Sequence, residues 1–259
     1  MQILLLFFAS YLAVIAGLWL VSVWKKDASI VDRFWGLLFI YLTCSFFFIF
    51  GEINWRKILL IFLVFVWGFR LSLYIHLRNR NHPEDVRYRR MRRKHGSIFW
   101  WYSFFSVFLL QASLALLISM PQFMIFSQFT SSSFIWSDFL GLILWTFGFV
   151  FEAGADWQLQ RFKAIPENRG KLLTTGFWAL TRHPNYFGDA CVWWGFYCFA
   201  LSADFGWMSI LGPLVMTLFL RYVTGVSLLE KGLKKSKPGY EDYVMNTPAF
   251  VPRLWPKIR

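Results

Sequence analysis

The sequence predicts an all-α polytopic membrane protein with about seven transmembrane helices, on three observations. Of its 259 residues, 57% are hydrophobic and 22% aromatic, whereas only 16% are charged. A soluble domain carries about a quarter charged residues. The apolar residues gather in stretches as long as a spanning helix, and the basic residues gather between these stretches. This composition excludes a soluble enzyme, a disordered chain and a disulfide scaffold.

Seven apolar stretches are long enough, or nearly so, to cross a bilayer as helices. They lie at about 3–24, 34–50, 57–77, 99–120, 134–152, 187–203 and 206–228. We therefore treat 1–259 as a single integral membrane domain with two halves. Residues 1–133 hold four helices, and residues 134–259 hold three helices and the tail.

The basic residues predict which loops face the cytosol. Of the 27 Lys and Arg, 23 lie in the segments 25–33, 78–98, 153–186 and 229–259. The loops expected on the opposite side hold only Arg56 and Lys57. Because short loops rich in Lys and Arg stay in the cytosol, we expect the N-terminus outside and the C-terminus in the cytosol. The net charge of +13 then reflects topology, and no nucleic-acid partner is expected.

Several ionisable side chains fall inside the expected spans or at their inner ends, where such groups are costly and commonly functional. They are Arg70, Glu152, Asp156, Asp189, Arg221 and Glu230. For Arg70 and Arg221, about two turns into their spans, we expect a buried polar cavity. This set predicts a polar pocket that opens to the cytosol.

The segment from Asp156 to Asp189 carries the side chains that such a pocket needs. Its cations suit phosphates, and its amides and carboxylates suit sugar hydroxyls or an adenine edge. The cations are Lys163, Arg169, Lys171 and Arg182, and the polar partners are Asn168, Asn185 and Asp156. The alternative is a basic loop that contacts only lipid headgroups.

The order of residues in this segment resembles a known family. The stretches KAIPENRGK at 163–171 and GFWALTRHPNYFGD at 176–189 resemble the C-terminal signature of the steroid 5-alpha-reductase family, most closely its bacterial-type branch known as DUF1295. Later pieces agree: RYVTGV at 221–226, LLEK at 228–231, PGYEDY at 238–243 and NTP at 246–248. In the first half, VDRFWG at 31–36 and EDVRY at 84–88 also fit.

The resemblance implies a seven-helix membrane fold with NADPH in a cavity that opens to the cytosol. It implies reduction of a carbon–carbon double bond conjugated to a ketone, as in 3-oxo-4-ene steroids or a related lipid. Cofactor contacts at matching positions are Asp156, Lys163, Lys171, Asn185 and Asp189, with Arg221, Glu230 and Lys234 from the last helix and tail. Asn168, Arg182 and Tyr186 complete the expected cofactor set. Asp189 stands where the family usually has Glu, which is longer by one methylene.

The first half is expected to face the substrate. Reductases of this family polarise the ketone with a Gln-Glu pair and a Tyr on early helices. Asp32, Tyr74 and Tyr88 are the nearest chemical equivalents here, and we expect them to be catalytic. The alternative for Tyr74 is an aromatic-belt residue, and for Tyr88 a surface tyrosine in a basic loop.

Two other function classes compete. Membrane methyltransferases of the isoprenylcysteine and phospholipid type show an Arg-His-Pro-x-Tyr run followed by acidic residues after the next helix. Here the run at 182–186 and Glu230 would then cradle S-adenosylmethionine. A single Glu followed by Lys, and the spare cations Lys163 and Lys171, favour the reductase. His183 is expected to be a structural donor at a turn. The third class is a non-enzymatic lipid-binding protein whose basic run at 87–94 contacts anionic headgroups.

The expected partners follow from the reductase reading. They are an apolar, lipid-like substrate and membrane lipids, with no obligate protein partner. The three cysteines fall in apolar spans and no Cys/His cluster has zinc spacing, so no metal is expected. The bacterial inner membrane and the endoplasmic reticulum fit the topology equally well.

Overall fold

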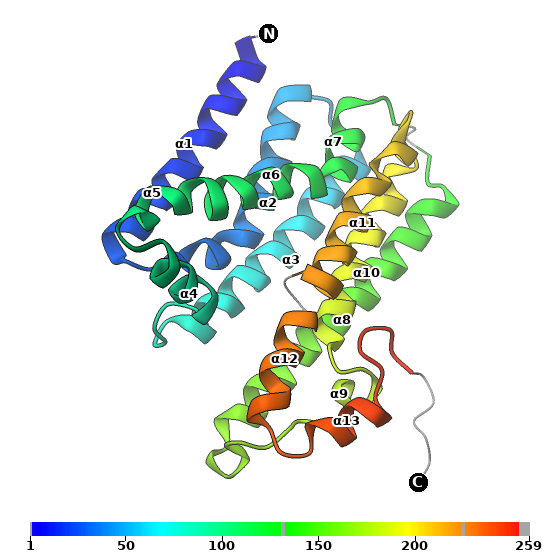
Figure 1. Cartoon of the computed structure of the whole chain (residues 1–259). Coiled ribbons are helices and arrows are strands. Elements are labelled where there is room, and N and C mark those ends of the chain that lie inside the picture. Colours follow the sequence, from blue (N-terminus) through cyan, green and yellow to red (C-terminus); the bar gives the residue numbers. More distant parts are fainter. Residues whose placement is uncertain (1, 131–132, 224–225, 254–259) are drawn as a thin grey trace. The chain divides into compact units, whose positions relative to one another are not determined.

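The structure, a computed structural model, describes residues 2–130, 133–223 and 226–253 (Figure 1). Within these ranges the chain forms helices and turns and contains no β-sheet. Six helical segments are long and apolar enough to cross a membrane, judged by length and composition. They are Gln2–Lys25, Ile30–Phe50, Trp55–Asn79, Val86–Ile118, Trp136–Ala164 and Gly206–Val223. The chain is an all-α polytopic membrane protein, as the sequence predicts.

The chain divides into two compact units, unit 1 (Met1–Ser132) and unit 2 (Ser133–Arg259). Unit 1 begins with three long helices, α1 (Gln2–Lys25), α2 (Ile30–Phe50) and α3 (Trp55–Asn79). The basic helix α4 (Val86–His95) follows and leads through the short turn η1 (Gly96–Ile98) into α5 (Phe99–Ser103). The π-helical segment η2 (Phe104–Leu109), α6 (Leu110–Ile118) and α7 (Met120–Ser127) complete the described part of the unit.

Helices α2 and α3 form the most extensive packing of unit 1. Gly36 and Gly68 face each other at their crossing, and a Cβ atom at Gly68 would lie 2.6 Å from the Gly36 carbonyl oxygen. The two backbones therefore approach closely because neither position carries a side chain. Helix α2 begins at Ile30, four residues before the expected start, so Asp32 lies in its first turn. A carboxylate is favourable there because it faces the positive end of the helix dipole.

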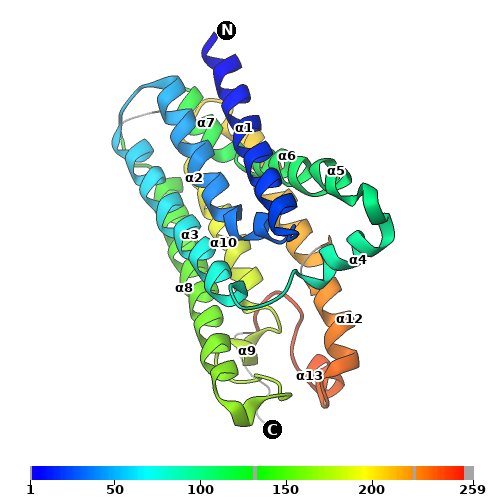
Figure 2. The same cartoon turned by 90° about the vertical axis from the view of Figure 1, so that its left-hand side faces the viewer.

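Unit 2 is built around α8 (Trp136–Ala164) and α10 (Pro184–Ala200). Between them lie η3 (Pro166–Asn168) and the short helix α9 (Phe177–Leu180). After α10 come η4 (Gly206–Ile210), α11 (Leu211–Leu218), the π-helical η5 (Phe219–Val223), α12 (Val226–Ser236) and α13 (Tyr240–Asn246). Figure 2 shows α8 and α10 side by side along the length of α10.

Glycines set the spacing of α8 and α10. A Cβ atom at Gly148 of α8 or at Gly188 of α10 would lie 2.5 Å from the carbonyl oxygen of the other glycine. The helices can therefore touch backbone to backbone only while both positions are glycine. This contact lies one turn before Glu152 on α8 and one turn before Val192 on α10. The contact therefore sets how the polar side chains near the C-terminal end of α8 face those near the N-terminal end of α10.

In unit 2, α8 and α10 differ from the spans expected from the sequence. Helix α8 continues twelve residues beyond the expected end at 152, because no helix breaker occurs before Pro166. Glu152, Asp156 and Lys163 therefore lie on one continuous helix and not in a loop. The sixth expected span, 187–203, corresponds to α10, whose 17 residues make it shorter than each of the six spanning segments.

Candidate functional site

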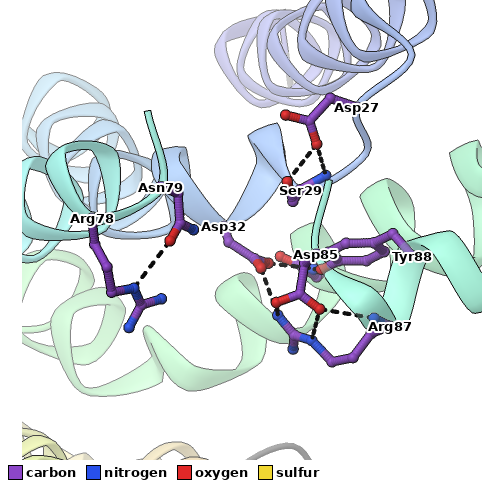
Figure 3. Close-up of polar contacts among 9 residues, drawn as sticks. Asp27, Ser29, Asp32, Arg78, Asn79, Asp85, Arg87 and Tyr88 are labelled. Carbon is purple, nitrogen blue, oxygen red and sulfur yellow. Dashed lines mark hydrogen bonds and ion pairs between the residues drawn. The ribbon is translucent and has the colours of Figure 1, made fainter. Parts of the chain in front are cut away.

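A hydrogen-bonded cluster in unit 1 centres on Asp32. Its Oδ1 accepts a hydrogen bond of 2.7 Å from the Tyr88 hydroxyl, and its Oδ2 pairs with Arg87 Nη2 at 2.7 Å. Figure 3 shows the carboxylate of Asp32 pointing toward both partners, which come from α4. The ion pair and the hydrogen bond together fix the carboxylate plane and the Tyr88 ring.

Gln111 of α6 joins Asp32, Arg87 and Tyr88 as the fourth side chain of this cluster. Its Nε2 donates to the Tyr88 hydroxyl oxygen at 3.1 Å. Tyr88 therefore donates its single proton to Asp32 while accepting from Gln111. Gln111 follows the π-helical segment η2, which changes the register of the helix just before this position. Such π-bulges are frequent at functional sites.

Asp85 supports the cluster from the start of α4. It caps the helix by accepting from the Arg87 backbone N–H at 2.8 Å, and it also accepts from Arg87 Nε at 3.0 Å (Figure 3). Burial alone would raise the pKa of Asp85, but these hydrogen bonds and the charge of Arg87 lower it below its usual value. Asp85 thereby holds Arg87 in position for Asp32.

The structure joins two of the three expected catalytic residues. Asp32 and Tyr88 are hydrogen-bonded, although 56 positions separate them in sequence. Tyr88 is 5% exposed and so is not a surface tyrosine. Tyr74 lies on α3, where the Arg78 guanidinium stacks 5.4 Å from its ring centroid.

In unit 2, a polar pair joins α8 to the first turn of α10. Asn185 Nδ2 donates to Asp156 Oδ1 at 3.1 Å, and Asn185 Oδ1 accepts from the Tyr186 backbone N–H at 3.1 Å. Asp189 follows one turn later on α10, and Glu152 precedes Asp156 by one turn on α8. All three carboxylates are buried, with exposed fractions of 2% for Glu152, 3% for Asp156 and 7% for Asp189.

Exposed cations and an amide lie at the end of α8 and beyond it. Lys163 and Lys171 are exposed, and Lys163 is seven residues after Asp156 on α8. That spacing places both on one face of the helix, about 10 Å apart along its axis. Asn168 donates from Nδ2 to the Phe162 carbonyl at 3.0 Å and so satisfies one of the last carbonyls of α8. The Lys171 carbonyl accepts from Lys237 Nζ at 3.1 Å.

Arg182 fastens the C-terminal segment to the loop before α10. Its Nε pairs with Glu230 Oε1 at 2.7 Å, and the exposed fractions of the two side chains are 8% and 17%. Its Nη1 donates to the Val244 carbonyl at 3.1 Å and to the Thr247 carbonyl. Because these donors bond Glu230 and backbone carbonyls of the C-terminal segment, Arg182 holds that segment against the loop before α10.

His183 caps α10 beside this ion pair. Its Nε2 lies 3.3 Å from Glu230 Oε1, and its ring stacks on Tyr186 at 5.7 Å between centroids. Burial lowers the pKa of His183 to about 4 despite the nearby carboxylate. The ring is therefore neutral at pH 7, and Nε2 must carry the proton that the carboxylate accepts. This agrees with the expected structural donor at a turn.

Further contacts dock the tail on the segment 178–182. Thr181 Oγ1 donates to the Phe250 carbonyl at 2.9 Å, and the Tyr243 hydroxyl donates to the Trp178 carbonyl at 2.5 Å. Burial raises the pKa of Tyr240 to about 12, with the charge of Glu230 adding to the shift. Burial of Glu230 opposes its ionisation, but the hydrogen bond and charge of Arg182 lower the pKa of this carboxyl.

The two remaining members of the expected cofactor set are exposed. Arg221 lies in η5, with its guanidinium 5.1 Å from the Tyr222 ring centroid and 5.9 Å from that of Phe250. The expectation of a buried position for Arg221 is wrong, because its side chain lies over aromatic rings at the surface. Lys234 is exposed on α12.

Sequence reasoning assigned no role to several residues that complete these clusters. Gln111 and Arg87 belong to the Asp32 cluster, and Thr181 and Tyr243 belong to the tail contacts. Thr181 and Tyr243 lie inside the quoted motifs, so a signal existed for them. Gln111 lies in an apolar stretch, and the signal that the sequence offers for it is that an amide side chain is rare in such a stretch.

Residues 18–247 match a family described as DUF1295, protein of unknown function. The chain belongs to this family. An uncharacterized protein of Schizosaccharomyces pombe is 27% identical over 270 residues, which cover 92% of this chain and 76% of that protein. A Delta(14)-sterol reductase of the same organism is 46% identical over 52 residues, 20% of this chain and 12% of the reductase. No solved structure matches the chain.

The family match confirms the predicted DUF1295 branch. The similarity to a sterol reductase is partial, and it is consistent with a steroid 5-alpha-reductase-like family. Together they indicate a membrane reductase or a methyltransferase-like protein, the two enzyme classes that the sequence predicts.

Proposed function

We propose that this DUF1295 protein is a membrane reductase that uses NADPH to reduce the carbon–carbon double bond of an apolar enone, a 3-oxo-4-ene steroid or a related lipid. The observation that carries the proposal is the hydrogen bond of the half-buried Asn185 to the buried Asp156 where α8 meets α10, with Lys163 exposed on the same face of α8. The partial similarity to a sterol reductase supports the reaction class.

The donor set of unit 2 fits a phosphorylated dinucleotide. Asp156 and Asn185 offer an acceptor and a mixed donor–acceptor, which suit ribose hydroxyls or an adenine edge. Lys163 and Lys171 offer exposed charges for the pyrophosphate and the 2′-phosphate. In this proposal Arg182 does not touch the cofactor but holds Asn185, three residues later, by anchoring the loop to the tail.

When bound, NADPH supplies the hydride that saturates the carbon β to the ketone. The α carbon takes a proton from solvent, and the products are the saturated ketone and NADP⁺. The Tyr88 hydroxyl is the proposed donor to the ketone oxygen as negative charge develops there. Its single proton points to Asp32 in the structure and turns to the ketone when substrate binds. Asp32 and Gln111 hold the Tyr88 hydroxyl from two sides, so its position is set before substrate arrives.

One observation favours the methyltransferase alternative. Glu152, Asp156 and Asp189 bring three buried carboxylates to α8 and α10, and a cationic sulfonium suits such a set. In that case S-adenosylmethionine, and not NADPH, is the ligand of unit 2. The two ligands differ in charge, so a binding measurement separates them.

The test is NADPH binding to the purified full-length chain with and without the Asn185 amide. We expect Asn185→Ala to weaken binding by about tenfold, since a hydrogen bond to the ligand or its carboxylate partner contributes about 1–2 kcal/mol. Asn246→Ala is the matched control, because Asn246 is exposed and bonds only the nearby Asp242 carbonyl. Equal NADPH affinity of the two variants would contradict the proposed site.

A further inference from the structure

A cavity of about 230 Å³ lies in unit 1 where the end of α1 meets α4 and α5. Its lining includes Ser22, Lys26, Arg92, Phe99, Trp100 and Ser103. Ser22, Phe99 and Ser103 are buried and form its floor, whereas Lys26 and Trp100 are exposed at its rim. The cavity therefore joins a protected interior to the surface, with cations and aromatic rings in its wall.

The charges around this cavity leave a net positive rim. Arg92 is paired with Glu84 at 2.7 Å and lies 4.5 Å from the Phe99 ring centroid. Glu84 also accepts from the Ala28 backbone N–H at 2.8 Å, so its charge is compensated within the protein. Asp27, the neighbour of Lys26, is engaged by Arg33 at 3.1 Å. Among the described residues no carboxylate pairs with the Lys26 ammonium.

Helix α4, beside the cavity, divides its basic residues between an inner and an exposed face. Of the basic residues of α4, Arg87 and Arg92 form internal ion pairs with Asp32 and Glu84. Arg90, Arg93 and Lys94 are exposed, at the i, i+3 and i+4 spacing that places them on one face. The basic run thus has two parts, one that builds the fold of unit 1 and one that faces outward.

We propose that this cavity binds the headgroup of an anionic phospholipid. Lys26, with Arg92 in the lining, supplies charge for the phosphate, and Trp100 supplies an amphipathic wall of the kind found at membrane interfaces. Trp19 of α1 stacks on Trp100 at 5.9 Å between ring centroids and extends this aromatic wall. This lipid site is separate from the proposed reductase function and does not depend on it.

The experiment titrates the detergent-purified full-length chain with three probes and follows its thermal unfolding midpoint. The probes are short-chain phosphatidylglycerol, phosphatidylcholine with the same chains, and inorganic phosphate. We expect a saturable stabilisation by phosphatidylglycerol alone. Lys26→Gln should raise the half-saturating concentration about fivefold, because one cation near an anionic headgroup contributes about 1 kcal/mol.

Lys25→Gln is the matched control, since Lys25 is exposed, adjacent and outside the cavity lining. Trp100→Ala and Trp101→Ala form a second pair that tests the apolar wall independently, because only Trp100 lines the cavity. Equal weakening by both members of each pair would overturn the site in favour of a diffuse surface charge. Stabilisation by inorganic phosphate at the same concentration would overturn the lipid as its occupant.

Discussion

At the residue scale, Asp32 shows how one carboxylate organises three helices of unit 1. One oxygen accepts from Tyr88 and the other pairs with Arg87, while Gln111 of α6 reaches the same tyrosine. Arg87 and Tyr88 are neighbours in sequence, but both lie far along the chain from Asp32 and from Gln111, so the cluster exists only in the folded protein. These bonds hold the oxygen of Tyr88 in one place, so only its O–H bond has to turn from Asp32 for the group to donate to a ketone.

Tyr88 and Tyr74 give the sharpest comparison within unit 1. We expect Tyr88→Phe to lower the free energy of unfolding by about 1–2 kcal/mol, through loss of the bonds to Asp32 and Gln111, and to lower turnover of an enone substrate about 100-fold. Tyr74→Phe keeps the ring over which Arg78 stacks and leaves the Asp32 cluster intact, so it should leave turnover within about twofold of the parent protein. Unfolding curves and reduction rates measure both, and a larger loss of turnover in Tyr74→Phe would exclude Tyr88 as the donor.

His183 predicts a specific dependence of stability on pH. Its pKa is about 4 in the folded protein and 6.5 ordinarily, so between these values the unfolded chain binds a proton that the folded chain does not. Stability therefore falls as the pH drops from 6.5 toward 4. Glu230, whose pKa is lowered from 4.5 mainly by Arg182 against its burial, adds a loss below pH 4.5.

The check is the pH profile of the unfolding midpoint in His183→Gln. The glutamine amide keeps a donor for Glu230 but does not titrate, so the profile should flatten between pH 4 and 6.5. His82→Gln is the control, because His82 is exposed beyond the end of α3. The account of His183 is wrong if both variants keep the slope of the parent protein.

At the element scale, α8 shows why the apolar stretches of a sequence predict the membrane-spanning segments better than they predict where helices end. Its apolar residues end near 152, but its helix continues through Glu152, Asp156 and Lys163 to Ala164. Polar residues are compatible with helical backbone, and only Pro166 stops it. The position of Asp156 on a helix face, and hence its reach to Asn185, could not be predicted from hydropathy. It follows from the glycine contact of α8 and α10.

That contact carries its own prediction. We expect Gly188→Ala to destabilise the protein by about 1–3 kcal/mol, because the new Cβ would lie 2.5 Å from Glu152 N and must push α8 away from α10. The same shift should separate Asp156 from Asn185 and weaken NADPH binding. Gly232→Ala is the control, because nothing lies within 4 Å of its added Cβ, and it should be neutral or stabilising by about 0.5–1 kcal/mol. Equal unfolding midpoints for the two variants would contradict the close packing.

At the scale of the whole molecule, the sequence predicts the fold class and much of the chemistry, but not the partners of the key residues. Composition and stretch lengths predict the helical membrane fold, and the motif order predicts the family. The chemistry of their side chains made Asp32 and Tyr88 candidate catalytic residues, but it did not indicate that the two are in contact. The pairing of Arg182 with Glu230, 48 positions later, required the folding of the tail onto the loop before α10. Long-range pairs of this kind leave no local pattern in the sequence.

The orientation of the chain in its membrane is a prediction that labelling can test. We expect a cysteine at Lys94 to react with a membrane-impermeant reagent only from the cytosolic side, since the basic loops face the cytosol. A cysteine at Asp204, in the turn after α10, should react only from the opposite side if α10 crosses the bilayer. Both positions are exposed. Labelling of both from one side would mean that α10 does not span.

The most direct test of the proposed function compares NADPH, NADH and S-adenosylmethionine as ligands of the purified full-length chain. A ligand that binds only the folded protein must raise its stability, by about 2.7 kcal/mol at a hundredfold excess over its dissociation constant. The account predicts a saturable rise in the unfolding midpoint with NADPH and no rise with S-adenosylmethionine. A rise with S-adenosylmethionine alone would contradict the reductase and establish the methyltransferase class.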